Sequence, residues 1–183
     1  MSKKETVNYV ENEEFLHHLK VHREKVKAAK EAGKPEPQQS NEIGLAILAI
    51  STNLAKSSNF SGYPFKDEMI MDGIENAVKA VASFNTDKYD KPFSYFSKVI
   101  YWAFVRRIQK EKKALYTKFK YIEKAVTDGK PVAINYDTDY MKSFIRDYDE
   151  AQEKKKQKAL ERATLKFEDE QNNEVNNDES DST

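Results

Sequence analysis

The chain contains no cysteine, which excludes disulfide bonds and thiolate zinc sites. No apolar run approaches the ~20 residues that a membrane-spanning helix requires, and the first residues lead into no signal-peptide core. We therefore expect a soluble, intracellular protein that does not bind a membrane.

Residues that could build an active site are also scarce. Only five glycines are present, none of them in a glycine-rich phosphate loop, and no serine and histidine are paired with positional support. His18 and His22 have the i, i+4 spacing that can chelate a metal, but a solvated helix face is the better interpretation. The sequence predicts no enzyme, no metal site and no cofactor.

Net charge is another absence, because 31 basic residues balance 31 acidic ones. The distribution is uneven, however. Residues 88–130 contain twelve basic residues and four acidic ones, whereas residues 167–183 contain seven acidic residues and no basic one. The middle of the chain is therefore basic and its end is acidic, although the net charge of the whole chain is zero.

Apolar residues recur at steps of three and four, which predicts an all-α fold. Helices are expected over residues 14–32, 41–58 and 66–84, from Pro92 to about residue 113, and over residues 139–166. We expect a loosely docked charged helix and proline-containing linker (1–39), a compact helical core (40–121), a charged helical extension (122–166) and a disordered acidic tail (167–183).

The helix that begins at Pro92 combines aromatic rings with cations. Single-stranded DNA binding needs cations for phosphates and flat rings on which bases stack. We assign Phe93, Phe96 and Phe104 to the core, and the other rings are divided between core and stacking platform. The predicted DNA-binding residues are Tyr95, Lys98, Tyr101, Trp102, Arg106, Arg107, Lys110 and Lys113.

Residues 67–84 resemble the second conserved region of bacterial sigma factors. The matching elements are Glu68, Met69-Ile70, Met71-Asp72-Gly73, Lys79-Ala80-Val81 and Phe84, and an aromatic helix beginning Phe93-Ser94 follows. The segments that start at Asn41, Asn59, Glu68 and Ala103 are similar to the late-transcription sigma factors of T4-type bacteriophages. This resemblance covers residues 41–120, and its four matches occur in the family's order.

The resemblance implies a promoter-specificity subunit for a bacterial RNA polymerase. The helix over residues 66–84 would dock on the coiled coil of the polymerase β′ subunit through Glu68, Met71, Asp72, Glu75 and Asn76. The following helix would open a minus-ten-like element and hold the non-template strand. Nothing after Lys130 resembles a helix-turn-helix, so we expect one short AT-rich element to be read.

The family also implies partners at the carboxyl end and a cellular location. Leu165 and Phe167 are the candidate anchors for the phage sliding clamp, which acts with a late co-activator. The expected location is the cytoplasm of an infected bacterial host. Two alternatives remain: a helical adaptor that binds RNA polymerase without DNA contact, and a general nucleic-acid-binding protein without a polymerase partner.

Overall fold

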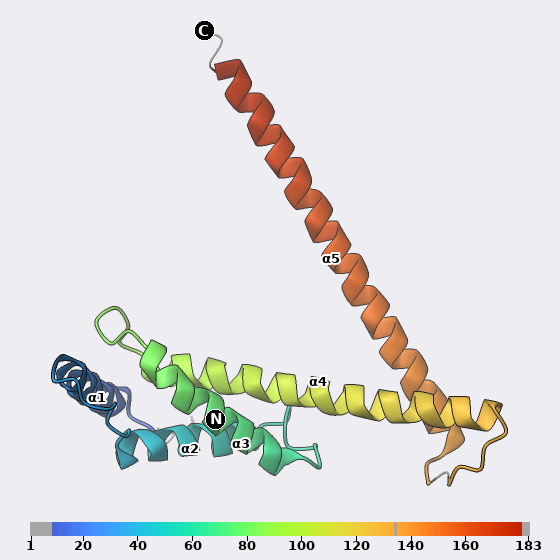
Figure 1. Ribbon diagram of the computed structural model, residues 1–183, viewed down its shortest axis with the longest axis horizontal. Coiled ribbons are helices and arrows are strands. Elements are labelled where there is room, and N and C mark those ends of the chain that lie inside the picture. Colours follow the sequence, from blue (N-terminus) through green and yellow to red (C-terminus); the bar gives the residue numbers. More distant parts are fainter. Residues whose placement is uncertain (1–8, 134, 181–183) are drawn as a thin grey trace, which may run out of the picture. The chain divides into compact units, whose positions relative to one another are not determined.

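The protein is all-α, which confirms the predicted fold class. The computed structural model describes the backbone of residues 9–133 and 135–180, and it describes side chains as far as Leu165. The helices are α1 (Asn12–Glu31), α2 (Asn41–Ala55), α3 (Lys66–Ala80), α4 (Pro92–Thr127) and α5 (Thr138–Ser180), with a 3-10 turn η1 (Val81–Ser83) after α3 (Figure 1). The described residues contain no strand.

The helix ends follow from local chemistry. Pro92 opens α4, where its missing amide proton costs no intrahelical bond. Gly129 ends it with φ of 69°, a conformation that favours glycine, while the Lys130 amide donates to the Ala125 carbonyl at 2.9 Å. The Asp137 side chain then caps α5 by accepting bonds from the amides of Asp139 and Tyr140.

Two helices are longer than the sequence indicates. No glycine or proline interrupts residues 93–128, so α4 continues past residue 113 to Thr127. The backbone of α5 extends as far as Ser180, beyond the expected end at residue 166. None of the helices in the described part of the chain combines the length and apolar character that a bilayer crossing requires.

The chain divides into two compact units, Met1–Glu111 and Lys112–Thr183, and the boundary falls within α4. In the first unit, α1 belongs to the core. Phe15 and Leu19 are each only 2 % exposed, and the Phe15 ring lies 5.2 Å from that of Phe96. The expectation of loose docking is therefore wrong, because a thin stripe of large buried side chains is enough to dock this helix on the core.

Gly73 allows close packing of helices in the first unit. A Cβ atom at this position would lie 2.8 Å from Phe104 Cε1, 2.8 Å from Ser51 Oγ and 2.9 Å from Ile100 Cγ2. The Ser51 hydroxyl in α2 donates to the Ile70 carbonyl in α3 at 3.1 Å. The absence of a side chain at Gly73 thus brings α2, α3 and α4 together.

The second unit has its own small core, built from the last turns of α4 and the first turns of α5. Phe119, Ile122, Met141 and Ile145 are buried in it. Beside them the rings of Tyr116 and Tyr148 stack at 4.3 Å. This unit is therefore held by aromatic and aliphatic packing on one side of each helix.

Candidate nucleic-acid and partner interface

The candidate site is centred on ion pairing between α3 and α4. Arg107 donates two hydrogen bonds to the carboxylate of Asp72, from Nε at 2.6 Å and from Nη2 at 2.8 Å. Its Nη1 atom donates to Glu111 Oε1 at 3.2 Å. These bonds, with Asp72 first and Glu111 second, raise the pKa of Arg107 above its ordinary value. The Arg107 side chain is only 17 % exposed, so this cation is used inside the protein.

A second hydrogen bond between α3 and α4 lies one helical turn further along α3. Arg106 Nη2 donates to Asn76 Oδ1 at 2.8 Å, and the Asn76 amide donates to the Asp72 carbonyl. The structure thus joins two predicted polymerase-binding residues to two predicted DNA-binding residues. Arg106 remains exposed, whereas Asp72 and Asn76 are half-buried. Helix α3 therefore helps to position the basic side of α4.

The exposed side of α3 carries the other three predicted polymerase-binding residues. Glu68 and Glu75 are exposed, and Met71 between them is 64 % exposed. Glu75 forms a salt bridge with Lys79 one turn later on the same surface. This surface is acidic with an apolar centre, and on the helix it lies beside the row formed by Asp72 and Asn76.

Two aromatic rings stand on the exposed side of α4. Tyr101 is 40 % exposed and Trp102 is 50 % exposed, and their rings meet edge to face with 5.5 Å between centroids. Tyr101 also packs against the buried Phe60 at 5.5 Å. Contact with Phe60 holds the pair in place, while much of both rings remains accessible for stacking.

Tyr95 lies at a cavity of about 430 Å³ near the start of α4. Its ring packs against Phe84 at 5.0 Å, so it is half-buried and anchored to the core. The full lining is Phe84, Tyr89, Asp90, Lys91, Ser94, Tyr95 and Lys98. Aromatic walls with two lysines at the rim are suited to a flat, apolar group that is attached to an anion.

The predicted DNA-binding residues of the first unit form a stripe along α4. Tyr95, Lys98, Trp102 and Arg106 recur at steps of three and four, so they share one side of the helix, and Lys110 continues it. All except Tyr95 are exposed. Arg107 departs from the stripe because Asp72 and Glu111 bind it, and Lys113 is exposed in the second unit.

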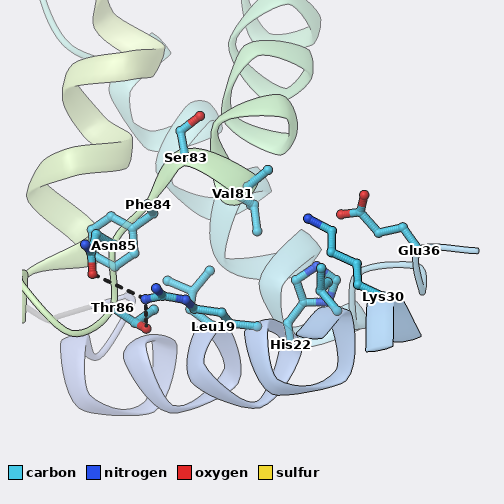
Figure 2. A pocket seen from close by; sticks show the side chains of 12 residues that line it. Leu19, His22, Lys30, Glu36, Val81, Ser83, Phe84, Asn85 and Thr86 are labelled. Atoms are coloured by element: carbon cyan, nitrogen blue, oxygen red, sulfur yellow. Dashed lines mark hydrogen bonds between the residues drawn. The ribbon is translucent and has the colours of Figure 1, made fainter. Parts of the chain in front are cut away.

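A second cavity, of about 320 Å³, lies between α1 and residues 81–86. Arg23 lines it and donates to Asn85 Oδ1 at 3.3 Å and to Thr86 Oγ1 at 3.0 Å, and it also pairs with Asp87 at 3.0 Å. Figure 2 shows the bonds to Asn85 and Thr86 at one end of the cavity and Lys30 at the other. Helix α1 therefore fixes the loop that leads to Tyr89.

The two histidines with chelating spacing lie in different surroundings. His22 is buried beside the second cavity, whereas His18 is half-buried and lies 3.9 Å from Glu14. Within the described residues, no group of three or more histidines and carboxylates gathers closely enough to hold a metal ion.

The two predicted clamp anchors lie near the end of the described side chains. Leu165 is 60 % exposed on α5. The side chain of Phe167 lies outside the described residues.

Three residues of the site were not predicted from the sequence: Tyr89, Lys91 and Arg23. Tyr89 and Lys91 fall in a segment that breaks the helical pattern, so periodicity assigns them no face. The sequence did contain a usable signal, because Tyr89 and Lys91 lie within three residues of Pro92. A proline at the start of a helix restricts the backbone there, so side chains just before it are held near the first turn of the helix. The partner of Arg23 is 62 residues away in the sequence, and no local pattern indicates it.

No protein-family model and no curated protein matches this chain.

Proposed function

We propose that this protein is a promoter-specificity subunit of the sigma type, which directs a bacterial RNA polymerase core to late promoters of a T4-type phage. It would read and open a short AT-rich element and hold the non-template strand. The observation that carries the proposal is the half-exposed Tyr101–Trp102 pair, with Lys98 and Arg106 on the same helix.

The chemistry of that helix supports contact with unpaired DNA. Each base stacked on an aromatic ring contributes about 1–3 kcal/mol, and lysine and arginine bind the adjoining phosphates with release of counterions. The cavity at Tyr95 offers a further place for an extruded base, because the rings of Tyr89 and Tyr95 line it together with Lys91 and Lys98. AT-rich DNA suits this mechanism because its flexible steps open at low cost.

The acidic side of α3 supports a protein partner. Glu68, Met71 and Glu75 would bind the β′ coiled coil, with the carboxylates setting the register and Met71 packing at the centre. Asp72 and Asn76 would act indirectly, since they bind Arg107 and Arg106. In this proposal the protein acts without a catalytic residue or cofactor, in the cytoplasm of the infected host.

The decisive test is transcription by core polymerase from a template whose only promoter is an AT-rich late element, with and without the protein. The expected result is initiation at that element only when the protein is present. A template with the element scrambled is the control. Polymerase binding without initiation would refute the sigma function.

An adaptor that binds polymerase without DNA is the second candidate. The exposed Met71 and Val78 on α3 favour it, because an apolar centre with acidic neighbours is a sufficient protein-binding surface by itself. The same assay separates the two, since an adaptor alters initiation by another specificity subunit and supports none by itself.

Clamp binding is a further part of the proposal and rests on the exposed Leu165 with Phe167 nearby. Truncation after Arg162 should leave basal initiation unchanged and remove its stimulation by the sliding clamp and co-activator. Stimulation that survives truncation would show that these two residues are not the anchors.

A further inference from the structure

The second unit carries a cationic surface of which only Lys113 belongs to the predicted DNA-binding residues. The C-terminal half of α4 (Figure 1) carries a row of residues at helical steps, and all five are exposed: Lys113, Thr117, Lys120, Tyr121 and Lys124. We call this row the α4 basic face. It lies opposite the side on which Phe119 and Ile122 are buried, so the fold of the unit does not occupy it.

The charged residues of the α4 basic face are all lysines. Residues 112–122 include four lysines and no acidic residue. Lys120 pairs with Glu123 at 2.9 Å, whereas neither Lys113 nor Lys124 forms an ion pair with any residue that the structure describes. Lys118 differs, because its ammonium binds the Tyr136 hydroxyl and lies over that ring. Lys113 and Lys124 are thus available to a partner, and the exposed Lys120–Glu123 pair is weak enough for Lys120 to exchange Glu123 for a phosphate.

Tyr121 adds a polar-tipped ring at the centre of the row. It is 69 % exposed, and it belongs to neither hydrophobic cluster among the described residues. A phenol in this position can donate its hydroxyl proton to a phosphate oxygen while its ring covers the adjoining sugar. The row therefore offers three cations and one neutral donor to an anionic surface.

We propose that the α4 basic face binds the phosphate backbone of duplex DNA. Lys113 and Lys124 are separated by eleven residues, or roughly 16 Å at 1.5 Å per residue. That length spans about five phosphates of one strand at 3.4 Å per step. A straight, rigid row with a single ring suits a duplex, because a single strand is bound by several rings in succession. The contact is independent of sequence.

The test uses the full-length protein with Lys113, Lys120 and Lys124 all changed to alanine. Alanine preserves the helix at these positions, and circular dichroism checks that it does. The matched control changes Lys154, Lys155 and Lys158 to alanine, which removes the same charge from the exposed surface of α5. Binding to a labelled duplex of mixed sequence is measured by fluorescence anisotropy from 50 to 200 mM salt.

The unaltered protein should bind the duplex, with an affinity that falls as salt rises. The triple variant should bind at least tenfold more weakly at 50 mM salt, and its log–log salt slope should be shallower by about 2 to 3, near 0.9 for each phosphate that is no longer neutralised. The control should retain the slope of the unaltered protein. Absence of duplex binding by the unaltered protein, or equal reductions in variant and control, would overturn the inference.

A proximity measurement gives an independent check. The chain lacks cysteine, so Tyr121→Cys provides one attachment point for a photo-cross-linker, with Lys158→Cys as the control position. Duplex should be cross-linked from position 121 and not from position 158. A triple variant that keeps duplex binding but loses affinity for core polymerase would assign the face to a protein and reject DNA.

Duplex binding by the free protein requires neither polymerase nor promoter melting. The inference therefore goes beyond the proposed function, and the two can fail separately. Loss of promoter-dependent initiation leaves the duplex measurement intact, and the reverse also holds.

Discussion

Arg107 of α4 binds Asp72 of α3 through both carboxylate oxygens, at 2.6 and 2.8 Å. From the sequence we expect Asp72 to bind RNA polymerase and Arg107 to bind DNA, yet in the structure these two side chains bind each other. Bidentate pairing of this kind fixes orientation as well as distance. The face of α3 that could bind a protein and the face of α4 that could bind DNA are therefore held together by a bond between their own candidate residues.

Removal of either partner should destabilise the first unit. Asp72→Ala and Arg107→Ala should each lower the free energy of unfolding by about 1–2 kcal/mol, since charge-assisted hydrogen bonds are removed from a partly buried site. Urea denaturation measures this. The double variant should lose less than the sum of the single variants, and strict additivity would show that the pair contributes no coupling.

Gly73→Ala should destabilise the protein even though alanine favours helix. The added methyl group would collide with Phe104, Ile100 and Ser51 at 2.8–2.9 Å, and overpacking of this kind costs about 1–3 kcal/mol. The gain in helix propensity offsets about 1 kcal/mol at most. We expect a lower midpoint in thermal unfolding.

Gly44→Ala is the matched control for that substitution. A Cβ atom at Gly44 meets nothing within 4 Å, so the change in α2 should stabilise the protein by about 0.5–1 kcal/mol. Equal effects at the two positions would contradict the close approach at Gly73.

Trp102→Ala should weaken binding to an AT-rich single strand and reduce promoter opening, because a stacking surface worth about 1–3 kcal/mol is removed. Trp102→Phe should restore part of the loss. Anisotropy with a labelled oligonucleotide and permanganate reactivity of the template measure the two effects. Tyr140→Ala on α5, where the ring is equally exposed, should change neither. If Trp102→Ala behaves like that control, Trp102 is not a stacking surface.

Glu68→Lys combined with Glu75→Lys should abolish binding to core polymerase and leave the helical spectrum unchanged. Both residues are exposed, and neither contributes to the α3–α4 bond. Reversal of two charges turns attraction into repulsion on a cationic partner. Lys79→Glu, a reversal on the same helix, should strengthen or preserve binding. Unaltered affinity in the double variant, measured by surface plasmon resonance, would place the polymerase contact elsewhere.

The positions of the helices could be predicted because apolar spacing and capping are local signals. Pro92 and Gly129 mark the two ends of α4 in the sequence itself, although the predicted helix ended short of Gly129. Burial of α1 was less predictable, since two large side chains docking on a distant helix leave little trace in a charged segment.

The site could be predicted only in outline. Exposure of Trp102 and Lys98 follows from their place on an amphipathic helix. Internal use of Arg107 does not, because its partner lies 35 residues earlier on another helix. A basic residue next to exposed cations looks the same in sequence whether it faces solvent or a buried carboxylate.

The burial of α1 affects how the protein can be shortened. A fragment beginning at Ser40 would retain every segment that resembles a sigma factor but would uncover Phe96 and release Asn85 and Thr86 from Arg23. Such a fragment should aggregate or bind poorly for want of its first helix, and its failure would say nothing about the role of the remaining residues. Functional dissection of this chain should therefore proceed by point substitution at its amino end.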